Sequence, residues 1–160
     1  FIYPDAWEKY LDPIPENERA TMIKSYYKRL TSNNKEIRIK ASKAWSIWEA
    51  STSKLIQSKD SLHSFNDDRV AEAFARIECH YFINKGFFKN DSWILDNVYK
   101  INKIPTYIVQ GRYDVVCPMT SAWELYKKLP NAKFEIIQDS GHSMLEIGIQ
   151  KKLIEITNSI

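Results

Sequence analysis

Apolar side chains recur at helical spacing along the first hundred residues. Met22, Tyr26 and Leu30 follow one another at intervals of four, and a similar rhythm continues through the alanines and tryptophans of the next segment. Residues at this spacing share one face of an α-helix, so each run predicts a helix with a buried stripe. The predicted helices cover residues 15–31, 34–56, 67–85 and 93–99.

Polar residues and one glycine mark the ends of these helices. The Ser-Asn-Asn run at 32–34 supplies a cap for the second helix, and Asp67 or Asp68 caps the third. Such side chains accept hydrogen bonds from the first free N–H groups of a helix. Gly86 is well placed to end the third helix. Residues 59–66 are predicted to form a polar loop.

The pattern changes at about residue 100. Residues 106–110 and 133–138 are short apolar runs typical of strands, and residues 120–129 between them have helical spacing. A strand, a crossover helix and a second strand form a βαβ unit, which places the two strands parallel in one sheet. Residues 147–156 predict a closing helix that packs on that sheet.

These patterns predict an α/β protein with a helical part and a sheet part. We expect residues 1–100 to form a helical cap or lid, and residues 101–160 to form the C-terminal part of a sheet domain. Two parallel strands cannot bury both faces of a sheet by themselves. We therefore expect further strands upstream of Phe1.

Composition and charge argue against several functions. The 160 residues carry a net charge of +3 with acids and bases interspersed, which favours neither nucleic acid nor a membrane surface as partner. No apolar run approaches the roughly 20 residues of a transmembrane helix. Cys79 and Cys117 lack CxxC spacing, which favours a reducing, cytoplasmic setting. His63 and His80 have no ligand-type residues at metal-binding spacing, so we expect no metal and no cofactor.

An aspartate and a histidine follow the two predicted strands. Asp114 lies in the loop after the first strand and His142 in the loop after the second. The carboxyl ends of parallel strands meet at one edge of a sheet, where active sites gather. The pair is therefore two thirds of a Ser-His-Asp triad, or else a turn aspartate and an ordinary loop histidine. Cys117 is either a reactive thiol or a small liner of the same cleft, and its loop holds no base, which favours the liner.

The third member of such a triad is missing from these 160 residues. In folds of this kind the serine lies in Gly-x-Ser-x-Gly, and no serine here has glycines on both sides at that spacing. Ser143 comes nearest, with Gly141 before it and Leu145 after it. We expect the nucleophile upstream of Phe1, and we expect this chain alone to be inactive.

Two glutamates are predicted on the aromatic faces of helices. Glu49 follows Trp45 by four positions, and Glu78 precedes Phe82 by four. A carboxylate on a buried face needs a positive partner. That partner is either a side chain of the fold, such as Arg69, Arg76 or a lysine, or the ammonium group of a ligand held by both carboxylates.

Five runs carry a family likeness: Gly111–Pro118, Ser121–Leu125, Gly141–Ser143, Trp45–Glu49 and Phe74–Phe82. Together they resemble the latter half of the proline iminopeptidases, serine peptidases of the α/β-hydrolase fold with a helical cap. The resemblance implies an enzyme that releases N-terminal proline from peptides, with Asp114 as the triad acid and His142 as the base. It also implies that Glu49 and Glu78 hold the free amino group of the proline, and that Cys117 lines the proline pocket.

Two other functions stay open at this point. One is another hydrolase of the same fold, an esterase or an epoxide hydrolase, whose cap binds a neutral substrate and whose glutamates pair internally. The other is a non-catalytic fragment that acts as a binding module. A serine or an aspartate in the elbow motif upstream would separate the peptidase from the epoxide hydrolase.

Overall fold

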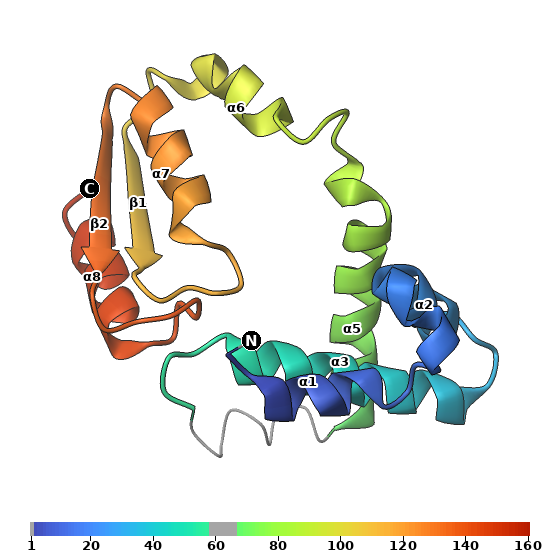
Figure 1. Cartoon of the computed structure of the whole chain (residues 1–160). Coiled ribbons are helices and arrows are strands. Elements are labelled where there is room, and N and C mark those ends of the chain that lie inside the picture. The colour runs from blue at the N-terminus through green and yellow to red at the C-terminus, as the bar shows by residue number, and fades with distance from the viewer. Residues whose placement is uncertain (1, 58–66) are drawn as a thin grey trace. The chain divides into compact units, whose positions relative to one another are not determined.

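A computed structural model describes residues 2–57 and 67–160 of the chain (Figure 1). The contacts divide the chain into two compact units, which we call the helical unit (Phe1–Ser51 and Gln57–Phe87) and the sheet unit (Thr52–Ile56 and Phe88–Ile160). The predicted polar loop at 59–66 and His63 lie outside the described residues.

The described elements of the helical unit are all helices. Its elements are α1 (Pro4–Leu11), the 3-10 helix η1 (Glu16–Thr21), α2 (Met22–Leu30), α3 (Lys35–Thr52, with its last residue in the sheet unit), α5 (Asp68–Ile83) and the 3-10 turn η3 (Lys85–Phe87). Helix α1 is not predicted from the sequence, although Pro4 in its first turn is a favourable start.

The helix predicted over residues 15–31 is wrong in its first part, where η1 precedes α2. In a continuous helix the carbonyl of Glu18 would accept a hydrogen bond from the amide of Met22. Here it accepts one from the Ser25 hydroxyl at 2.9 Å. Thr21 leaves the helical backbone region at φ −132° and ψ 60°, so a new helix begins after it.

Helix α3 confirms its predicted start and corrects its predicted end. The Asn34 side chain accepts hydrogen bonds from the backbone N–H groups of Glu36 (2.9 Å) and Ile37 (3.2 Å). The helix ends at Thr52 and not at 55 or 56. It ends there because the backbone of the following residues bonds to a loop of the sheet unit.

Helix α5 confirms the Asp67 cap, whose side chain accepts two N–H groups of the first turn at 2.8 and 3.0 Å. The helix ends at Ile83, short of the predicted 85. The next residues turn through the left-handed region, with φ of 52° at Lys85, 62° at Gly86 and 60° at Phe87. Glycine adopts this conformation without steric cost, so Gly86 serves the turn after the helix.

The core of the helical unit is aromatic. Tyr10 and Tyr26 stack with ring centroids 4.5 Å apart, and Trp45 meets Tyr26 edge-on at 5.2 Å. The core residues are Tyr10, Ile14, Tyr26, Leu30, Ala41, Trp45, Ala75 and Cys79. Large flat side chains bury much area for little conformational entropy, which suits a layer of short helices.

We expect Tyr26→Phe to lower the free energy of unfolding by about 1–3 kcal/mol, the cost of leaving a buried polar group without its partner. The fully buried Tyr26 hydroxyl donates to the carbonyl of Tyr10 at 2.5 Å. That carbonyl lies in the last turn of α1, where the helix supplies no partner. Denaturant unfolding measures the effect. Tyr81→Phe, on an exposed tyrosine of α5, is the matched control, and an equal effect of both changes would contradict the assignment.

The sheet unit holds the predicted βαβ arrangement. Its elements are α6 (Trp93–Asn97), the 3-10 helix η4 (Val98–Ile101), β1 (Thr106–Gly111), α7 (Met119–Lys128), β2 (Ala132–Ile137) and α8 (Ile147–Thr157). Strands β1 and β2 pair in parallel, in a register that runs from Thr106 opposite Ala132 to Gly111 opposite Ile137. The prediction of two parallel strands joined by a helix is confirmed.

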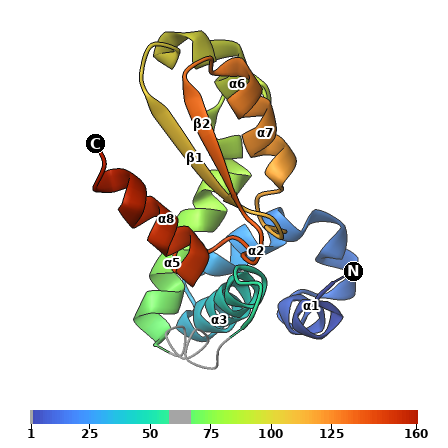
Figure 2. The same cartoon turned by 90° about the vertical axis from the view of Figure 1, so that its left-hand side faces the viewer.

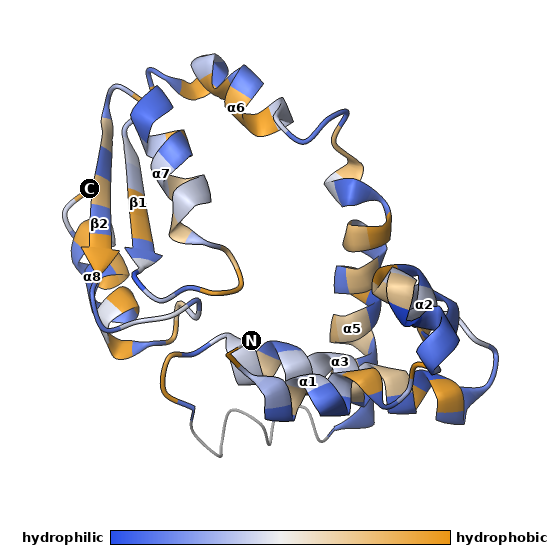
Figure 3. Cartoon of the chain, viewed as in Figure 1, coloured by the Kyte–Doolittle hydropathy of each residue, from blue (hydrophilic) through white to orange (hydrophobic). Residues whose placement is uncertain are grey.

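Helices α7 and α8 lie on opposite sides of the two strands (Figures 1 and 2). The Phe134 ring of β2 packs on α7, 5.2 Å from the Tyr126 ring and 5.6 Å from the Trp123 ring. On the other side, a Cβ atom at Gly148 of α8 would lie 2.5 Å from the Ile137 side chain, so the glycine permits a close approach. Apolar residues mark much of β2 and α8 (Figure 3).

Candidate active site

Strands β1 and β2 end at the same edge of the sheet, and their following loops are joined by backbone hydrogen bonds. The amide of Arg112 donates to the carbonyl of Ile137 at 2.9 Å, and the amide of Tyr113 donates to Ser140 at 3.0 Å. A Cβ atom on Gly111 would lie 1.8 Å from the carbonyl oxygen of Gly141. Only glycine fits there, and its absence of a side chain lets the two loops meet.

The two loops bring Asp114 and His142 together. The His142 Nδ1 atom lies 3.0 Å from Asp114 Oδ2. The Asp114 side chain is 5% exposed, whereas the His142 side chain is 39% exposed. A buried carboxylate therefore faces one nitrogen of an imidazole whose ring still reaches solvent.

Three further donors fix the Asp114 carboxylate. Its Oδ1 atom accepts hydrogen bonds from the backbone N–H groups of Val116 (3.0 Å) and Cys117 (2.7 Å). Its Oδ2 atom accepts one from the Gln110 side-chain amide at 3.0 Å. These donors hold the carboxylate in one orientation.

This arrangement selects one tautomer of His142. An ionised carboxylate can only accept hydrogen bonds, so the proton between the two residues belongs to Nδ1. The neutral ring then carries a lone pair on Nε2, which is the atom that takes a proton from a nucleophile in a Ser-His-Asp triad.

Cys117 takes part in the same turn through its backbone. Its amide donates to Asp114, and its carbonyl accepts a hydrogen bond from the Gln110 side chain at 3.1 Å. The residue is exposed. The Gln110 side chain thus donates to both Asp114 and Cys117, the first and last residues of this turn. The sequence alone did not predict this role. The only available signal was its place as the last polar residue of a predicted strand.

The His142 loop is held from its other side by residues that follow α3. The carbonyl of Ser53 accepts hydrogen bonds from the amides of His142 (3.0 Å) and Ser143 (2.7 Å). The Glu146 carboxylate accepts from two amides, with Oε1 2.8 Å from the nitrogen of Gly141 and Oε2 3.1 Å from that of Leu55. Sequence analysis did not single out Glu146, because its role depends on Leu55, which lies 91 positions away along the chain.

In the helical unit, the two predicted glutamates lie beside the aromatic core. Glu78 of α5 accepts a hydrogen bond from the Trp45 indole N–H at 2.6 Å. Burial raises the pKa of Tyr10 above its usual range, and the charges of Cys79, Glu49 and Glu78 raise it further. Both carboxylates are thus within electrostatic range of one phenol. Helices α3 and α5 bring Glu49 and Glu78 to the same aromatic cluster.

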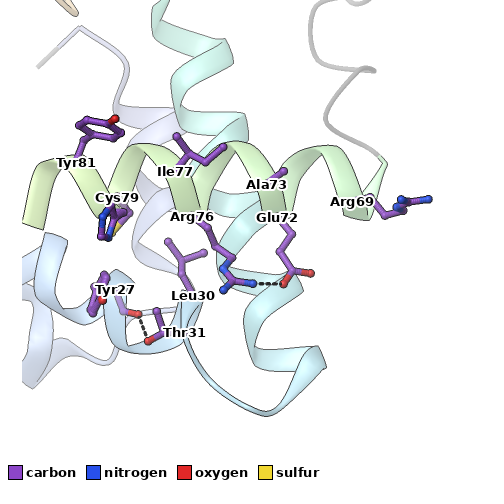
Figure 4. Close-up of a pocket in the computed structure, with 11 residues that line it drawn as sticks. Tyr27, Leu30, Thr31, Arg69, Glu72, Ala73, Arg76, Ile77, Cys79 and Tyr81 are labelled. Atoms are coloured by element: carbon purple, nitrogen blue, oxygen red, sulfur yellow. Dashed lines mark hydrogen bonds and ion pairs between the residues drawn. The ribbon is translucent and has the colours of Figure 1, made fainter.

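One of the arginines considered as internal partners, Arg76, contacts another carboxylate. Arg76 lies 3.2 Å from Glu72, which also binds Arg38 at 2.9 Å. Arg76 and Glu72 line a cavity of about 850 Å³ on α5, together with residues of α2 (Figure 4). Among the described residues, the lining of this cavity includes neither Glu49 nor Glu78.

Two further properties concern metals and membranes. Across residues 2–57 and 67–160, no group of three or more His, Cys, Asp and Glu side chains is arranged to hold a metal ion. Within the same ranges, no helix combines the length and the apolar character needed to cross a membrane.

Comparison with known proteins gives consistent matches. Residues 1–148 match the family described as alpha/beta hydrolase fold. The chain is 58% identical to a probable proline iminopeptidase of Leptolyngbya boryana over 158 residues, which are 99% of this chain and 49% of that protein. It is 53% identical to a proline iminopeptidase of Arabidopsis thaliana (96% of this chain, 40% of that protein) and 41% identical to one of Neisseria gonorrhoeae (99% and 50%). The chain spans about half the length of these relatives.

Proposed function

We propose that this chain, which belongs to the alpha/beta hydrolase family, is part of a serine aminopeptidase that releases N-terminal proline from peptides. The observation that carries the proposal is the contact of 3.0 Å between His142 Nδ1 and a buried Asp114 at the carboxyl ends of two parallel strands. The names of the relatives support the substrate.

The nucleophile has to come from elsewhere, since no Gly-x-Ser-x-Gly occurs in these 160 residues. We place it, with the oxyanion hole, on an upstream half of the same protein, and we call the joined protein the complete enzyme. We propose that the helical unit is its cap; this unit ends at Phe87, whereas the sequence predicts a cap over residues 1–100. Neither Cys79 nor Cys117 forms a disulfide among the described residues, which supports a cytoplasmic location.

The proposed mechanism follows from the tautomer of His142. Nε2 accepts the serine proton while the serine oxygen forms a bond to the prolyl carbonyl carbon. The imidazolium then gives that proton to the departing amine as the C–N bond breaks, and a prolyl ester remains on the serine. Water then loses a proton to the same Nε2 and bonds to the acyl carbon; as the bond to the serine oxygen breaks, the imidazolium returns the proton to that oxygen and proline is released. Asp114 stays ionised and stabilises the imidazolium at each step.

Recognition of the substrate falls to the helical unit in this proposal. A free N-terminal proline carries a secondary ammonium next to the scissile carbonyl, and two carboxylates bind it by charge-assisted hydrogen bonds. We assign this role to Glu49 and Glu78, with the Trp45 indole orienting Glu78. Cys117 is assigned to the proline pocket as a small apolar liner.

One observation favours a second candidate. The hydrogen bond from Trp45 partly satisfies Glu78 within the fold, as expected of a hydrolase that acts on a neutral substrate. An esterase or an epoxide hydrolase would keep the Asp114–His142 pair and would not need a ligand ammonium.

The products distinguish the two candidates. We expect the complete enzyme, incubated with a peptide that begins with proline, to yield free proline and the peptide shortened by one residue, as measured by mass spectrometry. A peptide left intact, together with rapid hydrolysis of a simple ester or an epoxide, would reject the aminopeptidase proposal in favour of the neutral-substrate hydrolase.

A further inference from the structure

The last residue of α3 and the four residues after it form a short strap against the loop that carries His142. The strap, residues 52–56, belongs to the sheet unit although it continues the helix that carries Glu49. The carbonyl of Ser53 accepts the amides of both His142 and Ser143. The backbone of the histidine is therefore fixed by a residue almost ninety positions earlier in the chain.

Glu146 joins the strap to the same loop by two hydrogen bonds, which we call the latch. Its two carboxylate oxygens accept one N–H from each side, Gly141 from the loop at 2.8 Å and Leu55 from the strap at 3.1 Å. The Glu146 amide also donates to the carbonyl of Ser143 at 3.0 Å, which closes the loop on itself. A single side chain thus bridges the backbone of the strap and the backbone of the loop.

The contact between strap and loop is tight. A Cβ atom on Gly141 would lie 2.9 Å from the nitrogen of Leu55 and 3.2 Å from Glu146 Oε1. The glycine next to His142 therefore lies directly against the strap. A displacement of the strap would carry the histidine with it, since no flexible side chain separates the two backbones.

We propose that Glu146 is a positioning residue for His142. It keeps the strap and the loop at the separation that holds Nδ1 on Asp114 and leaves Nε2 available for the nucleophile. The catalytic part of this inference rests on the proposed function, whereas the latch itself does not. Catalytic groups must be held within a fraction of an ångström, and their supporting hydrogen bonds are what hold them.

Two variants of Glu146 test the latch in the complete enzyme. Glu146→Ala removes both acceptors. Glu146→Gln keeps one carbonyl oxygen and replaces the other acceptor by an NH₂ group that cannot accept. Glu155→Gln, on an exposed glutamate of α8, is the matched control. We expect amide hydrogen exchange at Gly141 and Leu55 to be fastest in Glu146→Ala and intermediate in Glu146→Gln. The control should exchange at the rate of the unmodified enzyme.

The kinetic consequence should appear in kcat and not in KM. We expect kcat per active site, counted by titration with a serine-directed organophosphate, to fall about 10-fold in Glu146→Ala and less in Glu146→Gln. This is below the 10²-fold that a misplacement of about 1 Å can cost. KM for a prolyl anilide should stay within about twofold, and hydrolysis of a neutral ester should fall by the same factor, because both reactions use His142.

The outcomes separate the latch from the proposed function. Faster exchange with kcat per titrated site unchanged on both substrates would overturn the positioning role. Unchanged exchange at Gly141 and Leu55 would overturn the latch. If the unmodified enzyme hydrolyses the ester but not the prolyl anilide, the proposed substrate is wrong, and the exchange and ester measurements still decide the role of Glu146. If Glu146→Ala does not fold, Glu146→Gln carries the test.

Discussion

Asp114→Asn is expected to lower kcat of the complete enzyme about 10⁴-fold and to leave KM within a few-fold. The reason lies in the hydrogen bonds of the carboxylate. Two backbone N–H groups, those of Val116 and Cys117, point at Oδ1, so an asparagine must place its carbonyl oxygen there. Its NH₂ group then takes the position of Oδ2 and faces the imidazole.

An NH₂ group in that position reverses the tautomer of His142. Nδ1 has to accept a hydrogen bond, the ring proton moves to Nε2, and the lone pair needed for the nucleophile is lost. The Gln110 amide, which donates to Oδ2 at 3.0 Å, would meet another donor. The substitution is nearly isosteric, so binding should persist while turnover fails.

Steady-state kinetics with a prolyl anilide checks this prediction. The matched control is Asp139→Asn, on an exposed aspartate just after β2, which we expect to leave kcat within about twofold. Turnover of Asp114→Asn within a few-fold of the unmodified enzyme would exclude Asp114 from the triad.

Glu78→Gln is expected to lower kcat/KM for a substrate with a free N-terminal proline by roughly 10- to 150-fold. This corresponds to about 1.5–3 kcal/mol, the range for a hydrogen bond to a charged group. The glutamine oxygen can still accept the Trp45 indole N–H, now 2.6 Å from Glu78, so the helical unit should keep its structure. The second position then presents an NH₂ group, which repels an ammonium.

Selectivity is the informative part of this second prediction. Hydrolysis of a neutral ester should change less than about threefold, because the ester has no ammonium to lose. Glu49→Gln should behave in the same way, and Glu36→Gln, on an exposed glutamate at the start of α3, should change neither substrate. An equal loss on both substrates would favour the neutral-substrate hydrolase.

Local signals in the sequence were enough for the parts of the fold that depend on near neighbours. The caps at Asn34 and Asp67 and the parallel pairing of β1 with β2 are confirmed. A capping side chain bonds within two or three residues, and a short crossover helix leaves little choice but a parallel pair. The predicted juxtaposition of Asp114 and His142 follows from the same pairing.

The features that were not predicted depend on contacts between residues far apart in the sequence. Helix α3 stops at Thr52 because the strap bonds to the His142 loop, and periodicity alone carries on past that point. The break at Thr21 depends on the Ser25 hydroxyl, which donates a hydrogen bond to the carbonyl of Glu18. Gln110 and Glu146 look like ordinary polar residues until the fold places backbone amides and the Asp114 carboxylate beside them.

We propose that recognition of a free N-terminal ammonium makes the complete enzyme an aminopeptidase. The most direct test is the ratio of kcat/KM for a prolyl anilide to that for the same anilide with an acetylated nitrogen, measured on the complete enzyme. Two charge-assisted hydrogen bonds of about 1.5–3 kcal/mol each predict a ratio of at least about 10². A ratio near one would contradict this proposal, because it would show that the enzyme does not distinguish a charged from an uncharged substrate nitrogen.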